Sequence, residues 1–174
     1  MRVVHSLLRD TRAAAAAEMA LALPMLFVLI FTLFEAGNYF LAEHKVLKGV
    51  REGARYAARL DFEYFDCTNS GFKNTSNASL PTAATIQTQI KNVTLTGFVT
   101  GGSTRVSGWD ASDITINVSC NSTYDSGLYG TIPQNAAPTV QVVTGLTYEP
   151  VMGALGFGWK PILRAQSQAA VMGT

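Results

Sequence analysis

The residues that could carry out enzyme chemistry are sparse after residue 60. Both histidines, His5 and His44, precede that point, which excludes a Ser–His or Cys–His nucleophile pair in the later region. The acids in the later region lie in polar sequence, where Asp is most often a turn residue. They are Asp61, Glu63, Asp66, Asp110, Asp113, Asp125 and Glu149. The glycine-bearing stretches match neither a phosphate loop nor a dinucleotide fingerprint. We therefore expect no enzyme activity, no cofactor and no metal ion.

The two cysteines, Cys67 and Cys120, also lie in the later region. They have neither the spacing of metal ligands nor a nearby histidine. They form either one disulfide or two free buried thiols, and we favour the disulfide. It would close a loop of about 50 residues, which the chain-entropy account values at about 4 kcal/mol. It also requires an oxidising compartment.

Glu18 is an acid inside an apolar segment. Residues 13–34 carry no other charge, and as a helix these 22 residues would span about 33 Å, close to the hydrocarbon thickness of a bilayer. A carboxylate there costs several kcal/mol unless it is paired, protonated or near the interface. Glu18 is therefore either an acid at the membrane interface or the partner of a cation from another protein segment.

The composition agrees with one membrane anchor and one small domain. The 174 residues include 48% hydrophobic and only 14% charged residues, which few soluble domains of this size show. The net charge of +1 and the lack of a basic cluster among aromatics argue against nucleic acid as a partner.

The orientation of the anchor has evidence on both sides. A secretory signal peptide has the same layout, but this apolar run is longer than usual, and Phe34 stands where a cleavage site needs a small residue. Basic residues flank the run on both sides, with Arg2, Arg9 and Arg12 before it and Lys45, Lys48, Arg51, Arg55 and Arg59 after it. By count alone the C-terminal side would be cytoplasmic. The cysteines and the Asn/Thr-rich sequence favour an exported C-terminal region, so we expect the N-terminus inside.

Helical periodicity continues beyond the membrane segment. Val46, Val50, Gly53, Ala54 and Ala57 share one face of a helix over residues 37–60, whereas the opposite face is charged. The small residues on the inner face would let another backbone approach closely, either the chain's own sheet or a neighbouring helix. Of the two, we favour the sheet.

The remaining sequence predicts a small β-rich domain. A polar loop covers residues 61–80, and a short helix is predicted over residues 81–91. Three segments then alternate with a period of two: 114–120, 140–148 and 163–171. Their polar alternate positions predict an antiparallel sheet with one face on the helix and one in water. Cys120 shares the parity of Ile114, Ile116 and Val118, and so should point to the covered side, where Cys67 could meet it.

These elements predict four parts of the chain. They are a basic cytoplasmic leader at residues 1–13, a transmembrane helix at 14–36, an amphipathic stalk helix at 37–60 and an exported β-rich domain at 61–174. The fold class is α+β, with one long N-terminal helix packed on a small antiparallel sheet.

The N-terminal segment resembles the TadE-like family of tight-adherence (Flp-type) pilus assembly proteins. The resemblance rests on AAAAAEMALALPMLFVLIFTLFEAGNYF, with Glu18, Pro24, Glu35 and Gly37, and on REGARYAARL, and it covers about the first 60 residues. The later part is similar only in layout.

The resemblance implies a pilin-like fold and the role of a pseudopilin or minor pilin of a type IV pilus. A prepilin peptidase would cut between Ala13 and Ala14 on the cytoplasmic side of the inner membrane, and Ala13 stands where the family usually has Gly. Glu18 would then be the fifth mature residue and would pair with the amino group of a neighbour's Ala14. Its partners would be the membrane, other pilins, the pilus assembly machinery and the peptidase. The alternative function is an unprocessed single-pass envelope protein whose domain binds a ligand or partner.

Overall fold

A computed structural model describes residues 11–74, 81–123, 126–131, 136–153 and 158–173. The first ten residues of the predicted leader lie outside this set. The described residues divide into two compact units. One holds the chain up to Phe40 together with the loop that starts at Pro150, and the other runs from Leu41 to Glu149 and resumes at Trp159.

The first element is a continuous helix, α2 (Thr11–Ala58), of 48 residues. It includes the predicted apolar segment and nearly all of the predicted stalk, and it ends two residues earlier than expected. Pro24 lies inside it. Among the described residues, α2 is the one helix long and apolar enough to cross a membrane.

Three strands form an antiparallel sheet, as predicted, and the structure gives their order as β3-β4-β5: β3 (Ile114–Asn121), β4 (Ala137–Thr147) and β5 (Ile162–Ala170). Val118 is opposite Val140, which in turn is opposite Ala169. β4 lies in the middle, and β3 and β5 are each paired with it along their whole length.

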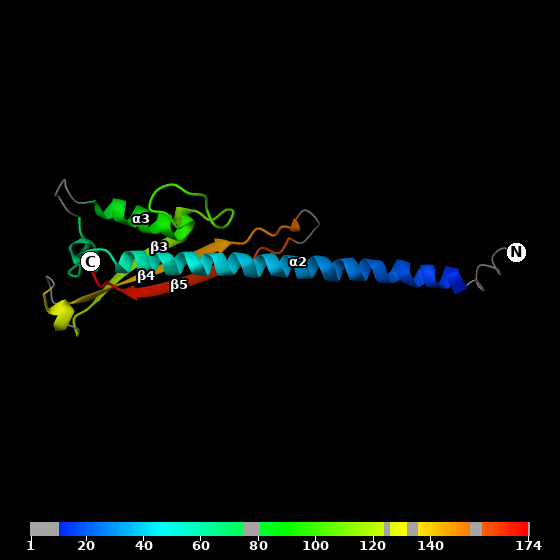
Figure 1. Ribbon diagram of the computed structural model, residues 1–174, viewed down its shortest axis with the longest axis horizontal. Coiled ribbons are helices and arrows are strands. Elements are labelled where there is room, and N and C mark those ends of the chain that lie inside the picture. Colours follow the sequence, from blue (N-terminus) through cyan, green and yellow to red (C-terminus); the bar gives the residue numbers. More distant parts are fainter. Residues whose placement is uncertain (1–10, 75–80, 124–125, 132–135, 154–157, 174) are drawn as a thin grey trace, which may run out of the picture. The chain divides into compact units, whose positions relative to one another are not determined.

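One face of this sheet is covered and the other is wet. Beyond the start of β4, the buried strand residues lie on one face of the sheet: Ile114, Val118, Val140, Val142, Thr144, Leu146 and Leu163. The opposite face holds exposed polar residues such as Thr115, Asn117, Arg164 and Gln166. The end of α2 (cyan in Figure 1) packs over the covered face, and the Met172 N–H donates to the Ala58 carbonyl at 2.9 Å. The α+β arrangement predicted from alternation is confirmed.

The second helix, α3 (Ala83–Thr96), differs in its bounds from the prediction over 81–91. Thr82 caps its start by accepting a hydrogen bond from the Thr85 N–H, and Gly97 ends it at a φ of 88°. The last turn contains Val93 and Leu95, whose side chains are buried. Burial of these side chains outweighs the modest helix propensity of this Thr- and Val-rich turn, which the sequence pattern did not reveal.

A small hairpin lies inside the predicted polar loop of residues 61–80. Strand β1 (Phe65–Asp66) pairs antiparallel with β2 (Gly71–Phe72). The Phe65 and Phe72 rings are 5.5 Å apart at their centroids, and Phe65 is buried. Two-residue strands carry too little alternation to be recognised in a sequence.

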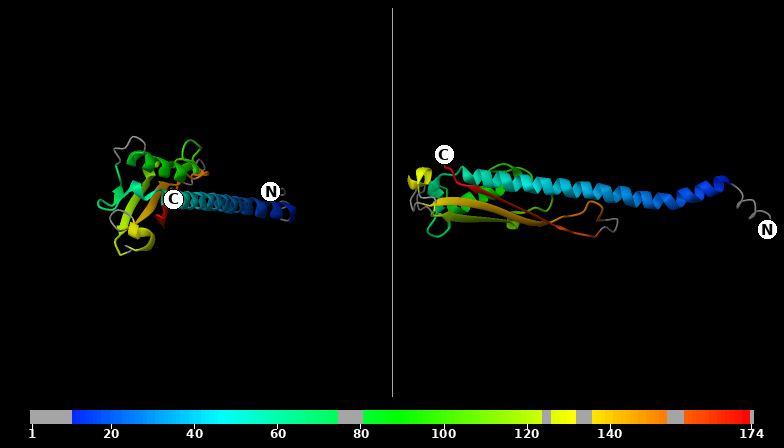
Figure 2. Two further views of the ribbon diagram at one scale, coloured as in Figure 1. Left: turned by 60° about the vertical axis from the view of Figure 1, so that its left-hand side comes forward. Right: turned by 90° about the horizontal axis from the view of Figure 1, so that it is seen from below.

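The small residues of α2 are in close contact with α3, a contact that the sequence analysis did not assign. A Cβ built on Gly49 would lie 2.4 Å from the Thr94 carbonyl oxygen, and one built on Gly53 would lie 2.0 Å from Thr94 Oγ1. Figures 1 and 2 agree in placing α3 (green) beside the cyan end of α2. The expectation that the sheet would take this close approach is therefore wrong at these two glycines.

Gly53→Ala is expected to destabilise the fold by about 1 to 3 kcal/mol, the usual cost of overpacking a core. Alanine normally favours a helix over glycine by about 1 kcal/mol, so the sign is set by the contact with Thr94. Thr94 is completely buried, and its hydroxyl donates to the Ile90 carbonyl at 2.8 Å, which leaves it little room to move. Chemical denaturation of the full chain in detergent micelles measures the change.

Gly37→Ala is the matched control, because a Cβ on Gly37 meets nothing within 4 Å. This variant should be neutral or more stable. Thr94→Ala removes the hydroxyl group that the new methyl group would contact. The loss in free energy of unfolding caused by Thr94→Ala should therefore be smaller in the Gly53→Ala background than in the wild-type chain. Equal stability of the two glycine variants would contradict the proposed packing.

Candidate assembly interface

The apolar part of α2 is uncovered within its unit. None of its most apolar 18-residue window is buried, and Leu21 and Met25 are each 78% exposed. A shallow apolar groove of about 560 Å³ runs along this helix beside Pro24, lined also by Met25, Val28, Leu29, Thr32 and Leu33. Apolar surface of this extent is typical of a membrane span or of a contact with other helices.

Glu18 is exposed on the same part of the helix. It takes no part in the ion pairs formed among the described residues. The predicted cleavage position, Ala13–Ala14, also lies within α2, and Ala14 is exposed. Ala14 and Glu18 are four residues apart, so they share one helix face. This arrangement leaves the carboxylate of Glu18 open to a cation from outside the chain.

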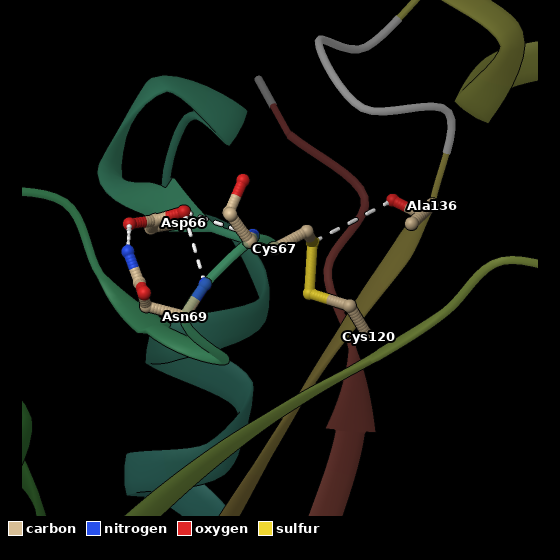
Figure 3. Close-up of a disulfide and its surroundings, with 6 residues drawn as sticks. Asp66, Cys67, Asn69, Cys120 and Ala136 are labelled. Carbon is tan, nitrogen blue, oxygen red and sulfur yellow. Dashed lines mark hydrogen bonds between the residues drawn. A yellow bond between two sulfur atoms is a disulfide. The ribbon is translucent and has the colours of Figure 1, made fainter.

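The predicted disulfide between Cys67 and Cys120 is confirmed (Figure 3). The two Cα atoms are 5.5 Å apart, and the bond closes a sequence separation of 53 residues. It joins the turn after β1 to the last part of β3. Cys67 Sγ also lies 3.9 Å from the Ala136 carbonyl oxygen, just before β4. The bond therefore ties the small hairpin to the main sheet.

Asp66 orders the turn that presents Cys67. Its carboxylate accepts hydrogen bonds from the Thr68 N–H at 2.9 Å and from the Asn69 side-chain amide at 2.7 Å (Figure 3 shows the Asn69 contact). The Asn69 side chain first, and the Thr68 backbone second, hold the pKa of Asp66 below its usual range. The contribution of this turn to stability is thus present above the usual carboxyl pKa and is lost as the pH falls through the lowered value.

The conspicuous Arg-Glu-Gly-Ala-Arg-Tyr sequence has a structural role inside the domain. Glu52 forms an ion pair with Arg105, whose backbone N–H donates to the Leu95 carbonyl at the end of α3. The Tyr56 hydroxyl donates to Gln89 Oε1 in α3 at 3.1 Å. Burial, and then the nearby Tyr64, raises the pKa of Tyr56, so the phenol remains a donor well above neutral pH. This segment fastens α3 and the loop that follows it to α2.

A second hollow lies on the wet face of the sheet. Its volume is about 540 Å³, and its lining includes Asp113, Thr115, Gly145, Arg164 and Gln166. It is open to solvent, and it offers one cation and one acid to a ligand. Among the described residues there is no group of three or more His, Cys, Asp or Glu that could hold a metal ion.

Glu35 makes a contact that the sequence analysis missed. Its carboxylate accepts hydrogen bonds from the Val151 N–H at 3.3 Å and the Met152 N–H at 2.9 Å. In the sequence, Glu35 is recognisable only as part of the family signature and as the first charged residue after the apolar segment. That position does not identify a binding partner more than a hundred residues away in the chain.

Comparison with known proteins supports the resemblance in the N-terminal segment. The family model described as TadE-like protein matches residues 13–55. The match covers Glu18, the uncovered apolar part of α2 and most of the segment that packs on α3. No curated protein and no solved structure matches the chain.

Proposed function

We propose that this chain, whose residues 13–55 match the TadE-like protein family, acts in tight-adherence pilus assembly as a pseudopilin or minor pilin. The observation that carries the proposal is that the matched residues include the uncovered apolar part of α2 and its acid, Glu18. Helix surface of this kind needs lipid or other helices around it.

We place residues 14–36 across the bacterial inner membrane and residues 61–174 in the periplasm. The Cys67–Cys120 bond supports this orientation, because disulfides persist in the periplasm and are rare in the cytosol. The count of basic residues favours the reverse orientation. Most of those that follow the span belong to the end of α2, where Arg51 and Arg55 are exposed on a helix packed into the folded domain, and Arg59 is exposed directly after it. We therefore give the disulfide of the folded domain more weight than the count of basic residues in assigning the orientation.

The assembly contact we propose is a pairing of charges between neighbouring helices. Hydrolysis of the Ala13–Ala14 bond by a prepilin peptidase would create a new ammonium group on Ala14. Along a helix, Ala14 and Glu18 are about 6 Å apart, so a neighbour displaced by about one turn would bring its ammonium group beside Glu18. The pairing would offset the cost of a carboxylate in hydrocarbon, while the groove beside Pro24 offers apolar surface to the same neighbour.

The mass of the intact protein extracted from membranes tests this proposal. We expect a chain that begins at Ala14, and we expect it to disappear when the prepilin peptidase is deleted. Ala13→Gly, which restores the residue usual in the family, should leave the start of the mature chain unchanged and increase the processed share. A chain that begins at Met1 in the presence of the peptidase would overturn the processing and the charge pairing together.

The alternative is an unprocessed envelope protein that uses its domain to bind a ligand. The hollow beside Arg164 is the feature that favours it. In that case the chain would begin at Met1, and Arg164→Ala would impair function while changes at Glu18 would not. Under the pilin proposal the two substitutions should have the opposite ranking.

A further inference from the structure

The loop after β4 is held to α2 at the end of the apolar segment. Glu35 directly follows Phe34, the last residue of the uncharged stretch. Its carboxylate binds two successive backbone amides, those of Val151 and Met152. Hydrogen bonds to an ionised acceptor are stronger than those between neutral groups. Because all three residues belong to one compact unit, the loop lies at the level along the helix where the apolar stretch ends.

The composition of this loop is unusual for a turn between two strands. Residues 150–159 carry no charged side chain. Val151 is 64% exposed, and Trp159, which ends this uncharged sequence, is 77% exposed. Glu149 and Lys160, the residues directly before and after this uncharged sequence, form an ion pair. Lys160 Nζ lies 2.8 and 2.9 Å from the two carboxylate oxygens of Glu149. Turns in water are usually rich in polar residues, whereas apolar residues and Trp are typical of the membrane interface.

We propose that the loop at Val151 and Met152 rests in the boundary between lipid headgroups and acyl chains, with Glu35 as the residue that holds it there. The loop is then a second membrane contact, beside the helix and continuous with its exposed apolar surface at Leu33 and Phe34. This inference rests on the membrane anchoring in the proposed function.

The hydrogen bonds of Glu35 answer two needs of such a site at once. A loop at membrane depth must satisfy its backbone N–H groups within the protein, and Glu35 accepts from two of them. A carboxylate near hydrocarbon also needs donors that stabilise its charge, and the two amides supply them. The chain would thereby contact the membrane through two segments that are far apart in sequence.

Quenching by brominated lipid tests the contact in the full chain reconstituted into phosphatidylcholine nanodiscs. In the Trp159→Phe background, Trp109 is the remaining tryptophan, and it is buried in the domain with 1% exposure. Adding Val151→Trp places an indole on the loop at an exposed position. We expect lipid brominated near the headgroup to remove most of the emission that this indole adds. Adding Glu35→Ala should restore much of this emission, because the loop loses its hydrogen bonds to α2 and leaves the lipid.

Glu43→Ala is the matched control, since Glu43 is an exposed acid on the same helix, and quenching should be unchanged in it. Phe34→Trp, also in the Trp159→Phe background, reports insertion of the span itself. Quenching at position 34 without quenching at position 151 would overturn the loop proposal and leave the anchoring intact. Loss of quenching at both positions would overturn the anchoring. Discs that hold one copy and discs that hold two copies should also be compared. If the indole at position 151 is shielded from bromine only in discs with two copies, a second chain, and not lipid, covers the loop.

Discussion

Glu18→Ala is expected to leave the protein inserted in the membrane and to abolish its co-purification with other pilins. Insertion should persist because the substitution makes the span more apolar. Assembly should fail because the ammonium group of a neighbour's Ala14 would lose its partner. Removing one member of a buried ion pair costs about 3 to 5 kcal/mol. Membrane fractionation, affinity purification of the tagged chain and a count of pili measure the two effects separately.

Two further variants separate charge from other effects of the Glu18 substitution. Glu18→Gln keeps the size and hydrogen-bonding capacity of the side chain but removes its charge, so it should also fail to assemble. Glu43→Ala removes an exposed acid that lies beyond the apolar segment, and it should assemble normally. Normal piliation with Glu18→Ala would contradict the pairing of Glu18 with a neighbour, whether or not the chain is processed.

Replacing both Cys67 and Cys120 by serine should lower the free energy of unfolding by about 4 kcal/mol, the chain-entropy value for a loop of this length. The bond spans 53 residues of sequence. Without it the unfolded chain regains that freedom, and the hairpin of β1 and β2 loses its covalent tie to β3. Denaturation of the full chain in micelles, followed by the emission of the buried Trp109, gives the difference.

The reduced wild-type chain is the control for the cysteine replacement. It should unfold at nearly the same denaturant concentration as the double serine variant, because both lack the same cross-link. A loss of less than about 1 kcal/mol would contradict the chain-entropy account of this bond. It would mean that contacts such as the one between Phe65 and Phe72 hold the hairpin without help.

Much of the architecture could be predicted because it follows from local patterns. Alternation with a period of two identified the three strands and the buried parity of Ile114, Val118 and Val140. Helical spacing identified the buried face of α2 at Val46 and Val50. These patterns survive in a single sequence because each residue reports its own burial, whichever neighbour covers it.

The candidate site could be predicted only in part. Glu18 was recognised because a charge among apolar residues stands out against its neighbours. The pairing of the cysteines was favoured because they have neither the spacing of metal ligands nor a nearby histidine. The contact of Glu35 with the loop at Val151 could not be derived. A carboxylate that binds backbone amides leaves no mark on the identity of the residues that donate them, since every residue except proline has that N–H group.

The sequence by itself thus determined that the chain has a membrane-length apolar helix bearing an acid, followed by an amphipathic continuation and an alternating β-rich region. Length, hydropathy and periodicity are properties of consecutive residues, and they need no knowledge of distant partners. Only the tertiary structure decided that Gly49 and Gly53 pack on α3, and that Glu35 holds the loop at Val151. The physical reason is that each contact involves the backbone of at least one partner, the glycines of α2 or the amides that Glu35 binds, and backbone atoms are chemically alike at nearly every position.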